Sequence, residues 1–315
     1  MRVAFYAKRH KRSGITLHME RALRELGHEV LRFNPHKTER LVGKKLAWWH
    51  ILRKTRAFKP DVAVVFTFDL SAPQIAELGQ FTRTCTFFDD CPHELSSRVH
   101  DAAKASHVFF ITNRGQIPLY EQELGVTPAY VTGGCDPTDH FRVDPAPEFV
   151  CDVAFIGQAD LRGGRVEVMQ ALAKEFDARV YGKNWPEIAG LEPAARDVYP
   201  PQYRQICNSA KVIIGNDLRQ DVDLYFSNRT WISLGCGAFL LTRYVPNLEE
   251  ILQEDEHCAF FRSTEHAVEQ VRRYLQDDEL RTRVAAQGHA YAHAEYSYAR
   301  MLERMLAHPG LQPRA

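Results

Sequence analysis

The chain has 315 residues, 45% of them hydrophobic, and carries 40 lysine and arginine residues against 40 acidic ones, so its formal net charge is zero. This length exceeds what one hydrophobic core usually supports and predicts two domains, while the balanced charge argues against nucleic acid as the main partner. The seven cysteines contain no C-x-x-C pair and no apolar run has the length of a signal peptide or a membrane span, so we expect a soluble cytoplasmic protein with reduced thiols and no structural zinc.

The first half of the chain alternates short apolar runs with longer amphipathic segments. We expect strands at 2–7, 29–33, 61–66, 83–88, 107–111 and 129–132, with helices at 15–27, 38–58, 72–79, 94–105 and 115–124. Near-continuous apolar strands that alternate with helices are typical of a parallel, doubly wound sheet. Residues 133–150 contain three prolines and two glycines and break the alternation, which makes them the best linker candidate.

The alternation resumes after the linker. We expect strands at 151–156, 178–181, 211–215, 239–242 and 258–261, and helices at 162–176, 228–234, 247–252, 264–276, 278–292 and 296–306. The prediction is an α/β protein of two Rossmann-like, doubly wound domains that face a central cleft. The expected domains are residues 1–140 and 151–295, with a helix at 296–315 that packs back on the first domain. Ligands of open α/β sheets bind beyond the carboxyl ends of the strands, so a ligand is expected in the cleft.

In the first domain, candidate residues follow the ends of predicted strands. The loop 8–14 ends in Gly14 and opens a helix, so it either binds an anion or a sugar hydroxyl or is a solvated basic loop. His18, on the first turn of that helix, is either a base or exposed to solvent. Asp89 and Asp90 follow a strand, and one of them is a candidate general base, with a helix cap as the alternative.

The basic segment 37–56 also contains Trp48 and Trp49. These residues indicate either contact with a membrane or a half-buried helix.

In the second domain, one set of candidates follows the first strand. Gly157 provides a turn, and Arg162 and Arg165 lie near a helix start, where arginine is unfavourable unless an anion compensates it. The alternative for both arginines is an ordinary surface position. Tyr181 and Gly182 follow the next strand and either form a stacking shelf for a base together with Trp185 or pack in the core.

A second set of candidates lies at residues 216–229. Asn216 ends an apolar strand, and Ser227 or Asn228 is expected to cap the following helix. Arg229 stands in the first turn of this helix, where a bound diphosphate would compensate its charge. The Asp-Val-Asp sequence at 221–223 has the D-x-D pattern, which we interpret as solvated loop acids and not as a metal site.

The second half of the sequence resembles the glycosyltransferase group 1 family, in particular its CgeB-like branch. The resemblance rests on VAFIGQ at 153–158, VYGKNW at 180–185, SNRTWISLGCGAFLLT at 227–242 and the continuation at 245–288. It implies the GT-B fold and transfer of a sugar from a nucleotide-sugar donor, held by the second domain, to a hydroxyl acceptor. Many members place a glutamate that meets the donor ribose where this chain has Ile232.

The resemblance and the residues together predict a hexosyltransferase-like enzyme without metal or other cofactor, in which arginines and helix amino ends stabilise the leaving diphosphate. A nucleotide-sugar epimerase of the same fold and a non-catalytic nucleotide-sugar binding protein are the alternatives. A nicotinamide dehydrogenase is disfavoured because no G-x-G-x-x-G sequence follows either leading strand.

Overall fold

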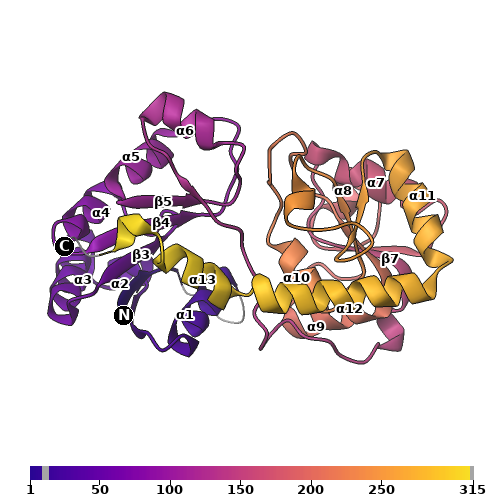
Figure 1. Ribbon diagram of the computed structural model, residues 1–315, viewed down its shortest axis with the longest axis horizontal. Helices are drawn as coiled ribbons and strands as arrows, with labels where there is room; N and C mark the ends of the chain where they lie inside the picture. Colours follow the sequence, from indigo (N-terminus) through magenta and orange to yellow (C-terminus); the bar gives the residue numbers. More distant parts are fainter. Residues whose placement is uncertain (9–13, 313–315) are drawn as a thin grey trace. The chain divides into compact units, whose positions relative to one another are not determined.

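A computed structural model describes residues 1–8 and 14–312 of the chain. It divides into two compact units (Figure 1): unit 1 consists of Met1–Thr132 with Tyr298–Ala315, and unit 2 of Gly133–Ser297. The chain thus leaves unit 1, builds unit 2 and returns to unit 1 with its last helix. No helix in the described ranges is both long enough and apolar enough to cross a membrane.

Unit 1 contains a six-stranded parallel sheet in the order β2-β1-β3-β4-β5-β6. The strands are β1 (Arg2–Tyr6), β2 (Glu29–Phe33), β3 (Val62–Phe66), β4 (Arg83–Phe88), β5 (Val108–Ile111) and β6 (Ala129–Tyr130). The helices are α1 (Ile15–Glu25), α2 (Pro35–Val42), α3 (Lys44–Phe58), α4 (Ala72–Gly79), α5 (Ser97–Ala105), α6 (Ile117–Leu124) and α13 (Tyr298–Leu306), and a 3-10 turn, Pro309–Leu311, follows α13.

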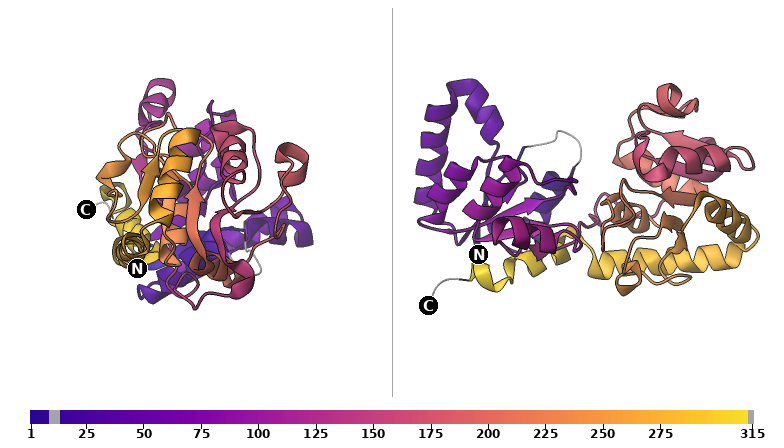
Figure 2. Two further views of the ribbon diagram at one scale, coloured as in Figure 1. Left: turned by 90° about the vertical axis from the view of Figure 1, so that its right-hand side faces the viewer. Right: turned by 90° about the horizontal axis from the view of Figure 1, so that it is seen from above.

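Helices cover both faces of the sheet of unit 1 (Figures 1 and 2). Val3 and Phe5 of β1 belong to one apolar core, together with α1 and α13, whereas Ala4 and Tyr6 belong to the other, together with α3, α4, α5 and α6. This split follows from the strand period of two, which sends successive side chains to opposite faces. Both faces are buried, which explains why the strands are apolar throughout.

Unit 2 contains a five-stranded parallel sheet in the order β11-β10-β9-β7-β8. The strands are β7 (Cys151–Ile156), β8 (Ala178–Tyr181), β9 (Ala210–Gly215), β10 (Leu240–Arg243) and β11 (Ala259–Phe261). The helices are α7 (Arg165–Leu172), α8 (Trp185–Ala189), α9 (Pro200–Ser209), α10 (Arg229–Gly235), α11 (Thr264–Leu275) and α12 (Asp278–Glu295), with 3-10 turns at Pro147–Phe149, Arg162–Gly164 and Leu248–Glu250.

The two parallel α/β sheets confirm the predicted fold class, and several element bounds differ. The helix expected at 38–58 is interrupted at Gly43, whose φ of 80° ends α2 before α3 begins. The helix expected from 162 starts only at Arg165, because Gly163 and Gly164 have φ of 75° and 71°. The segment expected to be helical at 247–252 is a single 3-10 turn. All seven cysteines are buried, and none of them forms a disulfide. The expected cleft stays a prediction.

Candidate functional site

Asp217 lies two residues beyond the carboxyl end of β9. Its side chain is buried, and its Oδ1 forms an ion pair of 2.9 Å with Nη2 of Arg229. Its Oδ2 accepts a hydrogen bond of 2.9 Å from the backbone N–H of Ser227. Asp217 therefore holds both the segment that leads into α10 and the guanidinium at the start of that helix.

Arg229 is fixed by further contacts. Its Nε donates to Oγ of Ser227 at 3.1 Å, and its Nη1 lies 3.5 Å from the carbonyl oxygen of Ile156 at the end of β7. The guanidinium also lies over the ring of Phe155, with Cζ 5.5 Å from the ring centroid. About 29% of the side chain remains exposed, so a ligand can reach this ordered cation.

Arg165, the first residue of α7, lies close to Arg229. Its Nη1 donates to the carbonyl oxygen of Gln158 at 3.0 Å, and its Cζ lies 5.7 Å from the centroid of the same Phe155 ring. Only 4% of the residue is exposed, and its Nε has no hydrogen-bond partner among the described residues. Burial, followed by the positive charge of Arg229, lowers the pKa of the Arg165 guanidinium to about 10. An anion would offset both effects.

Asn216 adds a second buried donor beside this pair of arginines. The residue is 2% exposed, and its Nδ2 finds no partner within the described parts of the chain. Asn216, Asp217, Ser227 and Arg229 line a cavity of about 10 Å³, which holds roughly one water molecule. Apolar residues, among them Ile214 and Leu240, line the rest of the cavity, so the arrangement is a small gap and not a preformed nucleotide pocket.

Two glycines allow this close packing at the ends of β7 and β8. A Cβ on Gly157 would lie 2.1 Å from Nη1 of Arg229, and a Cβ on Gly182 would lie 2.2 Å from the carbonyl oxygen of Gly157. The indole Nε1 of Trp185 donates to that same carbonyl oxygen at 2.8 Å. Tyr181 and Trp185 are both fully buried, so the structure supports core packing over a stacking shelf.

The remaining predicted residues of unit 2 are occupied by other contacts within the unit. Arg162 binds the Asp160 carboxylate through Nε at 2.9 Å and Nη2 at 2.7 Å, and this pairing lowers the pKa of Asp160 to about 2. The expected cap by Asn228 is wrong, since its side chain makes no capping bond on α10 and its Oδ1 accepts instead from the N–H of Gly134 at 2.7 Å. Asp221 is paired with Arg219 at 2.7 Å, as a loop acid.

The candidates of unit 1 lie on separate elements. Gly14 precedes α1 with φ of 139°, and residues 9–13 of its loop lie outside the described residues. His18 is buried, and its ring stacks on Tyr298 with centroids 5.4 Å apart, so the solvent-facing alternative is wrong. Asp89 accepts from Oγ1 of Thr67 at 3.0 Å, and burial raises the pKa of its carboxyl group.

Asp90 is not the cap of the following helix. Its Oδ1 accepts from the N–H of Cys91 at 2.8 Å, whereas the side chain of Ser96 accepts from Val99 at the start of α5. The cap alternative for this loop is therefore wrong, and both aspartates stay candidates for a base.

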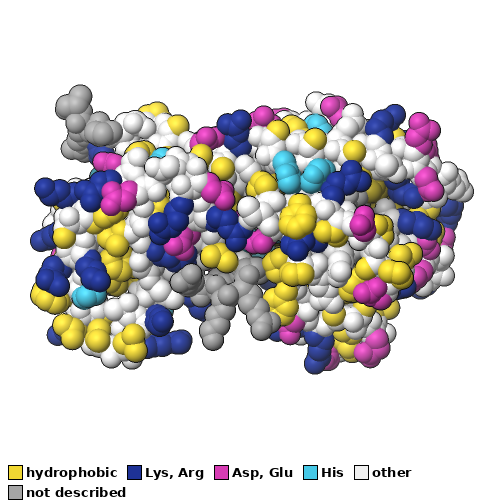
Figure 3. Space-filling model, turned by 90° about the horizontal axis from the view of Figure 1, so that it is seen from below, with side chains coloured by type: hydrophobic (Ala, Val, Ile, Leu, Met, Phe, Trp, Pro, Cys, Tyr) yellow, Lys and Arg dark blue, Asp and Glu magenta, His cyan; other side chains and the backbone are white. Residues whose placement is uncertain are grey.

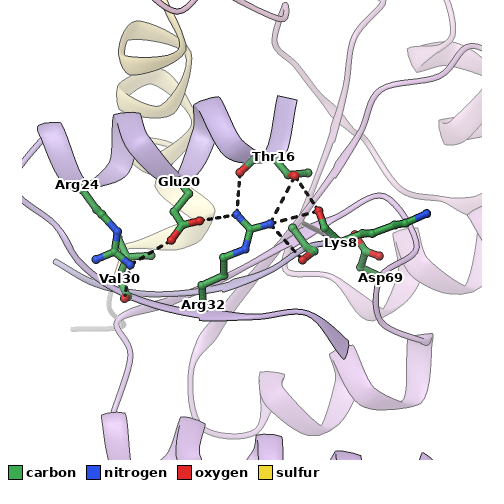
Figure 4. Close-up of polar contacts among 8 residues, drawn as sticks. Lys8, Thr16, Glu20, Arg24, Val30, Arg32 and Asp69 are labelled. Carbon is green, nitrogen blue, oxygen red and sulfur yellow. Dashed lines mark hydrogen bonds and ion pairs between the residues drawn. The ribbon is translucent and has the colours of Figure 1, made fainter. Parts of the chain in front are cut away.

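Sequence reasoning missed a charged network at the carboxyl end of β1 (Figure 4). Arg32 donates through Nη1 to Oε2 of Glu20 at 2.6 Å and to the carbonyl oxygen of Thr16 at 3.0 Å, and through Nη2 to the carbonyl oxygen of Lys8 at 3.2 Å. The N–H of Lys8 in turn donates to Asp69 at 2.9 Å. The network fixes Lys8 and Thr16, on either side of the loop at 9–13. The one feature of the sequence that could have indicated this network is Arg32, a single arginine inside the short predicted strand at 29–33.

The comparisons with known proteins agree with this architecture. Residues 165–307 match the family model described as glycosyl transferase-like. Sucrose-phosphate synthase from Thermosynechococcus elongatus has a TM-score of 0.66 at 11% identity, covering 96% of both chains. Anabaena HepE in complex with UDP-glucose also has 0.66, at 10% identity over 97% of this chain and 98% of that chain. A glycosyltransferase from Rickettsia africae has 0.66 at 10% identity over 96% of both chains. None of the curated proteins matches the sequence.

The fold is therefore that of the GT-B glycosyltransferases. Residues 165–307 are similar to the glycosyl transferase-like family, which confirms the resemblance to glycosyltransferases seen in the second half of the sequence. The CgeB-like branch stays a prediction.

Proposed function

We propose that the chain transfers a sugar from a nucleoside-diphosphate donor to a hydroxyl group of an acceptor. One observation carries the donor assignment: Arg165 and Arg229 both lie over the ring of Phe155, and burial and mutual repulsion lower the pKa of Arg165. Two cations that pack on the same aromatic ring favour a ligand with at least two negative charges. A diphosphate has that charge, and two oxygens of one phosphate group can accept the two parallel N–H bonds of a guanidinium fork.

The donors of the site would have distinct roles. Asp217 orients Arg229 through their 2.9 Å ion pair, so the cation is ordered before the ligand binds. The unpartnered Nε of Arg165 and Nδ2 of Asn216 would gain acceptors from the phosphate oxygens. Such prearranged donors stabilise charge that develops on a leaving group, here the released nucleoside diphosphate. We infer that these side chains, and not a divalent cation, supply the charge stabilisation.

For the acceptor side we propose Asp89 as the general base. Burial raises the pKa of its carboxyl group, which brings the group nearer to the range in which it takes a proton at neutral pH. The hydrogen bond from Thr67 fixes its orientation at the carboxyl end of β4. Asp90 is occupied by the N–H of Cys91, and His18 is stacked on Tyr298.

The test measures binding and turnover separately. Nucleoside diphosphates and nucleotide sugars are screened by thermal shift, with UDP and UDP-glucose first because HepE was solved with both. Donors that bind are then incubated with candidate acceptors, with and without EDTA. We expect stabilisation by a nucleoside diphosphate, and transfer that EDTA does not abolish. Complete loss of transfer in EDTA, restored by a divalent cation, would overturn the metal-independent part.

Ile232 favours a second candidate, a protein that binds nucleotide sugars without transferring them. It occupies the helix position at which related enzymes place an acidic residue, and it is half-buried on α10. An apolar side chain cannot accept a hydrogen bond from a ribose hydroxyl. Tight binding of nucleotide sugars without hydrolysis or transfer to any acceptor would support this alternative.

A further inference from the structure

Unit 1 carries a cluster of exposed apolar side chains at the junction of α2 and α3. Leu41, Val42, Leu46 and Trp49 are 72%, 45%, 52% and 57% exposed. They account for four of the ten large exposed apolar residues of the described chain, within nine positions. Figure 3 shows hydrophobic side chains at the surface of unit 1 with lysine and arginine side chains beside them, at the lower left. We call these four residues the 41–49 patch.

The exposure of the patch is a property of the fold and not of a frayed end. Ala47, Ile51 and Thr55 form the buried face of α3, at a spacing of four residues. Leu46 and Trp49 therefore lie on the opposite, outer face, where core packing cannot cover them. The guanidinium of Arg53 lies over the ring of Trp49, 5.3 Å from its centroid, and holds that ring on the outside.

The segment that carries the patch is strongly basic. Residues 35–59 contain eight lysine and arginine residues and a single acidic residue, Glu39, in a chain whose formal net charge is zero. Arg40, Lys44 and Lys45 directly flank the apolar residues and are all exposed. Positive charge and exposed apolar surface thus coincide in one segment.

A cavity lies directly beside the patch. It has a volume of about 510 Å³ and is lined by Lys8, His36, Glu39, Arg40, Gly43 and Lys44. Three of these six residues are permanent cations and one, Glu39, is acidic, so the net positive lining fits a compact anionic group such as a phosphate ester. Leu46 and Trp49 on α3 would at the same time contact an apolar chain of the same ligand.

We propose that the α2–α3 segment docks on the surface of an anionic phospholipid bilayer. Tryptophan and leucine on one face of a basic helix insert between headgroups, while the surrounding lysines and arginines attract the negative surface. The cavity beside the patch would take a lipid phosphate. A second copy of this chain is disfavoured as the occupant because two such positive segments would repel each other. Nucleic acid would leave Leu41, Val42 and Leu46 without a partner.

Co-sedimentation of the full chain with lipid vesicles tests this proposal. One set of vesicles is neutral phosphatidylcholine, and the other contains phosphatidylglycerol in addition. We expect sedimentation with the anionic vesicles, at least tenfold more bound protein than with the neutral ones, and release at high salt. The emission of Trp49 should shift to the blue on binding, since Trp185 and Trp231 are fully buried and Trp48 is half-buried.

Two paired variants separate the apolar from the electrostatic contribution. Leu46→Ser with Trp49→Ser, and Lys44→Glu with Lys45→Glu, should each reduce vesicle binding at least tenfold without changing the melting temperature, because all four side chains are exposed. The matched controls in unit 2 are Leu161→Ser, at 68% exposure, and Arg196→Glu, and both should bind as the wild type does.

Several outcomes would overturn the proposal. The protein could bind neutral and anionic vesicles equally well. Both paired variants could bind vesicles as tightly as the wild type, or the unit 2 controls could lose as much vesicle binding as the paired variants do. Self-association that Trp49→Ser abolishes, without vesicle binding, would assign the patch to a second copy instead. Binding to RNA without binding to vesicles would assign the charge to nucleic acid. None of these readouts depends on donor binding or sugar transfer.

Discussion

The carboxylate of Asp217 binds the guanidinium of Arg229 across 2.9 Å and, through its other oxygen, the backbone N–H of Ser227. One buried acid thus orders both the cation proposed to meet the diphosphate and the chain that leads into α10. Stability and ligand affinity are therefore linked at this pair, and a double-mutant cycle can separate them.

Arg229→Met should lower the stability of the fold by about 1–3 kcal/mol, because it leaves the buried Asp217 carboxylate without its cation. It should also weaken binding of nucleoside diphosphates by roughly 10–100-fold, the range for loss of a charge-assisted hydrogen bond. Adding Asp217→Asn should restore most of the stability and none of the affinity. Urea unfolding and calorimetric titration measure the two effects, and affinity recovered together with stability would argue against a direct contact of Arg229 with the ligand.

Gly157→Ala should abolish tight nucleotide binding while the unit still folds. The added Cβ would lie 2.1 Å from Nη1 of Arg229, so the guanidinium must move away from the ring of Phe155. Gly79→Ala in unit 1 is the control, since its nearest neighbour is the His107 ring at 3.2 Å and it lies in the other unit. Titration of both variants should show a loss for Gly157→Ala only. Equal affinities would mean that Arg229 does not need its observed position.

Asp89→Asn should raise the melting temperature near neutral pH. Burial raises the pKa of Asp89 in the folded protein. The protonated carboxyl group therefore adds to the stability of the fold below the ordinary pKa of aspartic acid. This stabilisation is lost as the pH rises through the folded-state pKa. Above that value the wild type holds a charge in a buried site, whereas asparagine holds none and still accepts from Thr67. The gain in melting temperature should shrink towards about pH 4, where Asp89 of the wild type is protonated.

The same substitution should lower sugar transfer at least 100-fold if Asp89 is the base, the lower end of the range for general base catalysis. Asp90→Asn, on the neighbouring residue, is the matched control for the rate measurement. Full activity of Asp89→Asn would remove this residue from catalysis even if its melting temperature rises.

Trp185→Phe should destabilise the protein by about 1–3 kcal/mol without changing its preference among nucleotide bases. The indole donates to the carbonyl oxygen of Gly157, and the side chain is fully buried, so the loss is one of packing and hydrogen bonding. Thermal unfolding gives the stability, and affinities for UDP, ADP and GDP give the preference. A changed order among the three nucleotides would restore the stacking role that the fold argues against.

The sequence predicted both sheets because strands buried on two faces must be apolar throughout, and runs such as 62–66 and 212–214 satisfy that demand. It also placed Gly157 and Asn216 directly after strands, where the structure has them; their role in donor binding stays a prediction. It could not predict the break at Gly43, since a glycine within a helical pattern is compatible with either one helix or two.

Contacts between distant positions were beyond the sequence. The side chain of Asn228 bonds to Gly134, 94 residues away, and not to the helix that it precedes. An asparagine just before a helix is also a common capping residue, so the sequence allowed a bond to the start of α10 equally well. Only the fold shows that Gly134 is the partner. The ion pairs of Asp217 with Arg229 and of Glu20 with Arg32 also join residues that are more than ten positions apart.

The most direct test is a calorimetric titration of UDP into the wild type and the Arg165→Met variant. Methionine preserves apolar volume and removes a buried charge, so the variant should fold with unchanged or higher stability. We expect that the wild type binds UDP and that the variant binds it at least about tenfold more weakly, because one of the two cations and its unpartnered Nε are gone. Equal affinity in two well-folded proteins would contradict a diphosphate site at Arg165 and Arg229.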